Sequence, residues 1–225
     1  METTRLATIV TAALAIAPIC AAQSPKRSPK LLQITSPANG AVVSPGDIVK
    51  VTVVSPANVR FDSVALGSPI VDGFSGVATS VPAEFSLRVP PDIACGKDLV
   101  SVMGRTISGQ SIWAAIELDV ERPDTPIQLS LNESGDTRNW DLELVARGEP
   151  WHLVVLATFS DGRILVVTES SRVTYRSSNT RVARVDRHGE ITPVGIGSAS
   201  VTVTYTNGNQ NVRIAIPVNV KLTPY

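Results

Sequence analysis

The feature that most limits the fold of this chain is a strict alternation of apolar and polar residues near its C-terminus. The stretch 201–205 alternates valine or tyrosine with threonine, and a turn at 207–209 leads into 212–220, where every second residue is apolar. Such alternation turns one face of a strand toward a core and the other toward solvent. Because Pro217 cannot donate to a ladder, we expect the second stretch at a sheet edge or a bulge.

Shorter stretches with the same pattern fill most of the remaining chain. Phe85, Leu87 and Val89 alternate with polar residues and should share one face. The Asp161-Gly162 pair between apolar runs is a hairpin signal, because glycine accepts the positive φ of such turns. No segment has helical periodicity. Further strands are expected at 48–54, 98–104, 111–120, 151–159 and 163–168.

Many short strands separated by turns predict an all-β fold built as sandwiches. Two prolines in four residues, at 123–126, interrupt the pattern and mark a linker between two units. We therefore predict two tandem immunoglobulin-like β-sandwich domains, at 31–122 and 127–225. Each has about the size of an immunoglobulin-type sandwich.

The N-terminus has the features of an export signal. Arg5 precedes an apolar run at 6–17, and small residues follow a proline, which predicts a cleaved signal peptide at 1–22 and a flexible linker at 23–30. A lipoprotein signal at Cys20 fits poorly, since Ile19 precedes the cysteine. The apolar run is too short to span a membrane. We expect an exported protein that is extracellular, at the cell surface or periplasmic.

Cys95 is the only thiol left after such cleavage, so no disulfide within the chain is expected. A buried apolar role is the more common one for a free cysteine, and a bridge to another molecule is the alternative.

A series of segments in the second unit carries a resemblance to a known family. In order along the chain they read ATFSDGR at 157–163, VTYRSSN at 173–179, VARVD at 182–186, GEIT at 189–192 and GIGSASVTVT at 195–204. This series resembles the bacterial Ig-like group 2 (BIG2) family over roughly residues 127–220. In the first unit, the segments 36–46 and 85–93 look like parts of bacterial Ig-like modules. The resemblance implies tandem modules used for adhesion, spacing or display, and it implies no substrate.

The residues needed for catalysis are scarce. The chain has two histidines, His152 and His188, and they are far apart in the sequence from each other and from Cys95. One thiol and two separated imidazoles do not make a zinc site. The acids near Gly135 match no calcium loop and are expected to be solvated. We therefore predict no enzyme, no cofactor, no metal and no small-molecule substrate.

Charge narrows the class of partner. Twenty basic residues balance twenty acidic ones, which gives no whole-protein attraction for nucleic acid or an anionic membrane. A local cluster remains, whose forked guanidinium groups could hold acidic polysaccharide or phosphate. A solvated strand face is the alternative. The cluster consists of Arg172, Arg176, Arg181, Arg184, Arg187 and His188. Its candidate ligand contacts are Arg176, Arg181, Arg184 and Arg187.

The tryptophans offer a second candidate contact. Trp140 follows a polar stretch and is predicted to be exposed, whereas Trp113 lies in an apolar strand and is expected in the core. The sequence thus favours a structural, adhesive or protein-interaction role at the cell surface, with an unknown protein or glycan partner. The alternative is a carbohydrate-binding accessory module that recognises acidic or cell-envelope glycans.

Overall fold

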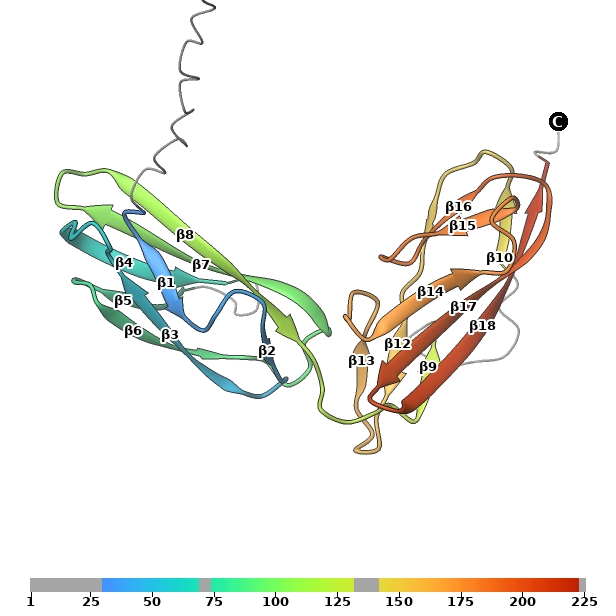
Figure 1. Ribbon diagram of the computed structural model, residues 1–225, viewed down its shortest axis with the longest axis horizontal. Coiled ribbons are helices and arrows are strands. Elements are labelled where there is room, and N and C mark those ends of the chain that lie inside the picture. Colours follow the sequence, from blue (N-terminus) through green and yellow to red (C-terminus); the bar gives the residue numbers. More distant parts are fainter. Residues whose placement is uncertain (1–29, 69–73, 132–141, 223–225) are drawn as a thin grey trace, which may run out of the picture.

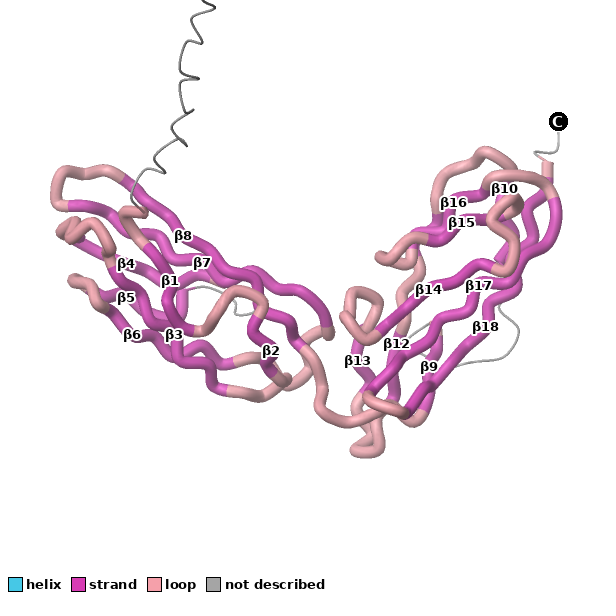
Figure 2. The backbone as a smooth tube through the Cα atoms, viewed as in Figure 1, coloured by secondary structure: helices cyan, strands magenta, loops and turns pink. Residues whose placement is uncertain are grey.

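The computed structural model of the chain describes residues 30–68, 74–131 and 142–222. The predicted signal peptide and all but the last residue of the predicted N-terminal linker lie outside these ranges. Every regular element in the described residues is a strand, which confirms the all-β prediction (Figure 2). The strands gather in two lobes (Figure 1), which we call the N-terminal sandwich (β1 to β8) and the C-terminal sandwich (β9 to β18).

The N-terminal sandwich has two sheets. The smaller has the strand order β1 (Gln33–Ser36), β3 (Ile48–Val54), β6 (Ala83–Arg88). The larger has the order β2 (Ala41–Val43), β8 (Ser111–Val120), β7 (Gly96–Thr106), β4 (Phe61–Gly67), β5 (Phe74–Ala78). The chain crosses from the smaller sheet to the larger between β1 and β2, and β2 then runs parallel to β8.

The C-terminal sandwich divides its strands among three sheets. The largest has the order β10 (Leu142–Val145), β18 (Gln210–Lys221), β17 (Gly197–Asn207), β14 (Val173–Ser177). The second has the order β11 (Trp151–His152), β16 (Glu190–Pro193), β15 (Ala183–Val185), and the third β13 (Ile164–Val166), β12 (Leu156–Thr158), β9 (Gln128–Ser130). As in the other sandwich, a short strand, β10, runs parallel to the last long one, β18.

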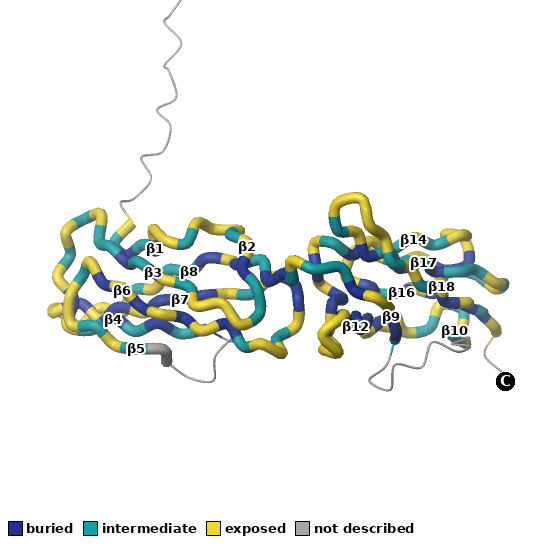
Figure 3. Tube along the Cα trace, turned by 90° about the horizontal axis from the view of Figure 1, so that it is seen from below, coloured by how far each residue is buried: buried dark blue, intermediate teal, exposed yellow. Residues whose placement is uncertain are grey.

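Each sandwich has its own hydrophobic core, and the alternation in the sequence explains it. Phe85, Leu87 and Val89 are buried together, and so are Val201, Val203 and Tyr205, as predicted. The buried residues run along the interior of both lobes (Figure 3). Cys95 is the exception to the division. It precedes β7 of the N-terminal sandwich in the chain, but it packs into the core of the C-terminal one.

One predicted strand is wrong in its extent. The stretch 151–159 is not continuous, because β11 ends at His152 and β12 begins at Leu156. The two pieces belong to different sheets, since β11 pairs with β16 and β12 pairs with β9 and β13. Between them, the Leu153 N–H donates to the Gly189 carbonyl and the Val155 N–H to the Thr168 hydroxyl. An apolar run tells that a segment is buried, but not that it changes sheets.

The predicted hairpin at 160–162 is confirmed. Gly162 has a φ of 82°, its N–H donates to the Phe159 carbonyl, and β12 and β13 pair on either side. Pro217 lies in β18 opposite Ser200, one residue before β10 begins to pair at Val218. Its missing N–H therefore falls outside the part of the strand that β10 covers.

The prediction that Trp113 packs in the core is wrong. Its side chain is 73% exposed, whereas Ile116, Leu118 and Val120 of the same strand are buried. The physical reason is the alternation of β8, in which the even-numbered residues face the core and Trp113 faces outward.

Candidate functional site

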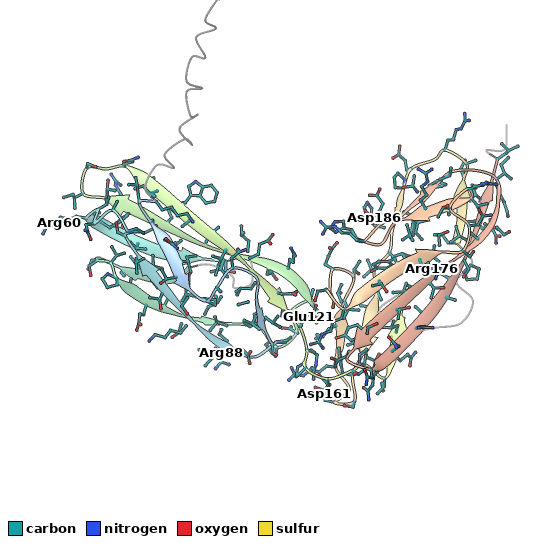
Figure 4. All side chains as sticks on the ribbon, in the orientation of Figure 1. Arg60, Arg88, Glu121, Asp161, Arg176 and Asp186 are labelled. Carbon is teal, nitrogen blue, oxygen red and sulfur yellow. The ribbon has the colours of Figure 1, made fainter. Side chains whose placement is uncertain are left out.

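The most elaborate arrangement of polar groups in the described residues lies where the two sandwiches meet. It centres on Glu121, the residue after β8, which is only 2% exposed. Figure 4 shows Glu121 between the two lobes. Its carboxylate accepts hydrogen bonds from Ser170 and Ser171 of the C-terminal sandwich. The Ser170 hydroxyl lies 2.7 and 2.8 Å from the two oxygens, and the Ser171 N–H and hydroxyl lie 2.7 and 3.1 Å from Oε1.

Two arginines pair with the acidic side chains of this junction. Arg172 Nε lies 3.8 Å from Glu121 Oε2, and its Nη1 donates to the Arg122 carbonyl. Arg122 in turn donates to Asp124 at 2.8 and 3.1 Å and to Asp161 at 3.0 Å, with its guanidinium 4.5 Å above the Phe159 ring. A buried carboxylate is tolerated when it is both paired and hydrogen-bonded, and Glu121 meets both conditions.

The same interactions alter the proton affinities of the paired groups. The hydrogen bonds to Asp124 raise the pKa of Arg122. The Arg163 N–H that donates to Asp161, together with the Arg122 guanidinium, lowers the pKa of Asp161. Arg122 and Asp161 are therefore charged around neutral pH, and the hydrogen bond between them is charge-assisted.

The segment before β7 makes a second contact across the junction. The Cys95 N–H donates to the Val166 carbonyl at 2.8 Å, and Pro91 accepts from Arg163 at 3.0 Å. Gly96, with a φ of 138°, approaches Glu169 so closely that a Cβ atom would lie 2.8 Å from it. The position therefore requires glycine on two counts, backbone conformation and space.

The prediction that Cys95 is buried is confirmed, since the thiol is free and 2% exposed. Burial, and then the charge of Glu121, raise the pKa of this thiol to about 11. A thiolate is the reactive form of cysteine, so this thiol is poorly suited to act as a nucleophile near neutral pH.

Sequence reasoning missed the junction. Glu121 stands between an apolar strand and a proline linker, which marks it as unusual. Its partners are two serines and an arginine about fifty residues away, and no pattern links the two segments.

The predicted arginine cluster is only partly assembled. The four candidate contacts are exposed, whereas Arg172 lies at the junction beside Glu121. Arg176 on β14 (Figure 4) and Arg184 on β15 line one shallow hollow with Tyr175, Ser177, Thr180 and Val185, whereas Arg181 and Arg187 do not line it. The hydroxyl of Tyr175 donates to the Thr168 carbonyl, and burial raises the pKa of this phenol.

The remaining predicted contacts lie elsewhere. Trp140 lies outside the described residues, so its exposure stays a prediction. The two histidines are both exposed, and each meets a glutamate. His188 Nδ1 lies 2.7 Å from Glu169 and His152 Nε2 lies 3.3 Å from Glu190.

Two kinds of site are absent from the described ranges. Histidine, cysteine, aspartate and glutamate side chains form no group of three that could hold a metal ion there. Among the same residues, no helix has the length and hydropathy needed to cross a membrane.

Solved structures with a similar course of chain include fibronectin(III)-like modules of Clostridium thermocellum CbhA, with 16% identity and a TM-score of 0.33. That alignment covers 40% of this chain and 93% of the module. Domains 4 and 5 of the S-layer protein SbsC align at 12% identity and a TM-score of 0.32, over 85% of this chain and 96% of that one. A Parabacteroides merdae β-glucuronidase aligns at 13% identity and a TM-score of 0.35, over 82% of this chain and 24% of the enzyme.

No curated protein matches the chain in sequence. A family model does match, over residues 144–216, and its description is "Bacterial Ig-like domain (group 2)". The matched range runs from β10 into β18 and so takes in most of the C-terminal sandwich. The resemblance noted in the sequence is thereby confirmed for the C-terminal half of the chain, which carries a bacterial Ig-like domain of group 2.

Proposed function

We propose that this chain is an exported, non-catalytic surface protein whose two sandwiches are held in one fixed arrangement, so that it spaces or displays a binding surface. The observation that carries the proposal is the buried carboxylate of Glu121. A flexible linker needs no buried charge, whereas the Glu121 carboxylate is buried and accepts hydrogen bonds from donors of the other sandwich. The group 2 Ig-like domain agrees with a structural or interaction role.

The non-catalytic part of the proposal rests on the surroundings of the reactive side chains. The Cys95 thiol is buried in a core, and each histidine lies beside an acid at the surface. No nucleophile, base and orienting group come together among them. A surface location is supported by the predicted signal peptide.

The arrangement of the two sandwiches can be tested by measuring a distance between them. Spin labels on cysteines introduced at Arg60 and Arg213, one in each sandwich and both exposed, should give a narrow distance distribution by double electron–electron resonance. The buried native thiol should stay unlabelled. In Glu121→Ala, the distribution should broaden, because Ser170, Ser171 and Arg172 lose their shared acceptor.

Glu117→Ala is the matched control. Glu117 lies on β8, shortly before Glu121 in the chain, but it is exposed and its side chain forms an ion pair with Lys97 at the surface. Its loss should leave the distribution unchanged. A broad distribution in the unaltered chain, or the same broadening in both variants, would refute a fixed arrangement.

One observation favours a second candidate function, the binding of an anionic glycan. Arg176 and Arg184 present two exposed guanidinium groups to one hollow, where a carboxylate or sulfate could be held from two sides. Double replacement of both arginines by alanine should abolish retention on an immobilised polyuronate. Arg60→Ala, in the other sandwich, should not. If all three proteins pass through the column alike, the glycan function is excluded.

A further inference from the structure

The N-terminal sandwich has an open strand edge. β2 pairs with β8 only at Leu118–Val120, and in the described residues no strand pairs with the same side of β8 over Ser111–Glu117. At Glu117, this side is closed by a loop, since the Glu117 N–H donates to the Asn39 side chain and its carbonyl accepts from the Gly40 N–H. Beyond Glu117, toward the start of the strand, no loop of the described ranges covers the edge in this way.

The register of β7 and β8 shows which backbone groups of β8 do not bond to β7. In an antiparallel pair, alternate residues direct their N–H and C=O to opposite sides of the strand. Because those of Glu117 point to the open side, those of Trp113 and Ala115 do so as well. Ala114 and Ile116 instead bond to β7, opposite Val102 and Val100. Backbone donors and acceptors are obligatory hydrogen-bonding groups, and in the described part of the chain none pairs with those of Trp113 and Ala115.

This edge borders a cleft of about 730 Å³. One wall is β8 at 112–116, and the other is formed by residues 30–35 of the opposite sheet and 37–39 (Figure 1, β1 in blue and β8 in light green). The lining is mixed, because Gln33, Thr35 and Asn39 lie among apolar residues, and Lys30 is its only charged residue. Leu32 and Ile116 belong to the core as well. The exposed indole of Trp113 stands beside it.

We propose that this cleft binds an extended segment of another polypeptide, which adds to β8 as a strand. The unpaired backbone groups of Trp113 and Ala115 recognise the main chain of the segment. The apolar residues of the lining take side chains of every second residue, as in other cases of strand addition. The inference rests on the proposed interaction role and names the partner chemistry, a neutral peptide strand with apolar residues at alternate positions.

The second wall decides between a single strand and a second copy of this chain. Two sandwiches that join edge to edge through β8 would bring β7 of the second copy to the far side of its β8. The second copy would also bring its own residues 30–35 and 37–39 to the same edge, beside the wall that is already there. An isolated strand, about 4.8 Å from β8, brings no second wall with it, so the bounded cleft suits a single strand better than the edge of another sheet.

The experiment combines selection with amide exchange. A phage-displayed library of seven-residue peptides is selected on the full chain, and the most enriched peptide is synthesised. In the free chain, the amides of Trp113 and Ala115 should exchange fast, while those of Ala114 and Ile116 should be protected. The bound peptide should protect all four.

A pair of variants tests the hydrogen bond itself. Ala115→Pro removes the outward N–H but leaves the ladder to β7 intact, since proline is tolerated where the N–H faces an open edge. It should weaken peptide binding about 2- to 12-fold, the value of one net hydrogen bond. Ala115→Ser keeps the N–H and should bind normally. Should the proline variant misfold, the exchange measurement on the unaltered chain still decides.

Several results would overturn the inference. The first is protection of Trp113 and Ala115 in the free chain, which would mean that the chain or a second copy already covers the edge. The second is the absence of any enriched peptide. The third is peptide binding without protection of these two amides. A failure here together with a narrow spin-label distance would reject the peptide site alone. A broad spin-label distance, with Trp113 and Ala115 protected only when the peptide is bound, would reject only the fixed arrangement.

Discussion

The last long strands of the two sandwiches, β8 and β18, occupy equivalent positions, but the residues along their outer edges differ. Each pairs with a long antiparallel neighbour and, near its end, with a short parallel strand, from Leu118 in β8 and from Val218 in β18. Before that point, the outward backbone groups of β8 belong to residues such as Trp113 and Ala115. Those of β18 include Arg213 and Pro217.

This difference matters because an open edge invites pairing with other chains. Charged residues and prolines are the usual means of blocking such an edge. β18 has both, since Arg213 puts a charge there and Pro217 lacks an N–H, whereas β8 has neither over 111–116. We infer that one sandwich is closed to strand addition by its sequence, and that the other is left open to it.

The largest expected effect lies in the part of β8 that β2 covers. Leu118 is fully buried, so Leu118→Ala should lower the free energy of unfolding of the N-terminal sandwich by about 2–5 kcal/mol, from lost burial and a cavity. Urea denaturation measures it. Leu99→Ala, at a leucine that is 46% exposed on the neighbouring strand, is the control and should cost far less. Equal losses in the two variants would contradict the assignment of Leu118 to the core.

The next effect tests how far the two sandwiches are separate, because Cys95 joins them. Burial raises the pKa of its thiol from 9.0 to about 11, so the folded chain holds the proton more tightly than the unfolded chain. The associated stability, about 2–3 kcal/mol, is complete below pH 9 and is lost as the pH rises toward 11.

Urea denaturation at pH 8 and pH 11 measures this dependence. Cys95→Ala is the reference, because it removes the thiol and keeps every other group that titrates in the same range. The unaltered chain should lose more stability than the variant over this interval. Equal losses would mean that the thiol is not held in the core.

The degree to which the sequence predicts the fold differs between these regions for a physical reason. Alternation within one strand is local, so the burial of Val201, Val203 and Tyr205 could be read directly. The same alternation predicts that Trp113 faces outward, because Ile112 and Ile116 lie on the other face of the strand. This face was missed because residues 112–116 are all apolar, so no polar residue marks the outward side.

Features that depend on two distant segments could not be predicted in this way. The break between β11 and β12 follows from pairing with two different sheets. The burial of Glu121 follows from its contact with Ser170 and Ser171. Of the predicted arginine site, Arg176 and Arg184 meet because β14 and β15 both border the hollow, which spacing along the chain does not reveal.

A smaller effect is expected if the edge of β18 is made to resemble that of β8. Replacing Arg213 by Thr and Pro217 by Val restores an N–H and removes a charge along this edge. The variant should self-associate weakly, at about 0.5–1.5 kcal/mol for each new hydrogen bond. Sedimentation velocity over a range of concentrations measures this. Arg213→Lys with Pro217 retained is the control and should sediment as the unaltered chain does. A double variant that stays monomeric would show that these two residues do not prevent strand pairing at this edge.

The smallest effect separates binding from stability at the open edge of β8. Trp113 is 73% exposed, so Trp113→Ala should change the free energy of unfolding by no more than about 0.5 kcal/mol. The same variant should weaken the selected peptide, because the indole is the largest apolar surface beside the cleft. Urea denaturation and peptide titration on one protein sample measure the two effects together. A loss of stability near that of Leu118→Ala would contradict the exposed position of Trp113. Unchanged peptide binding would mean that only the backbone of β8 recognises the peptide.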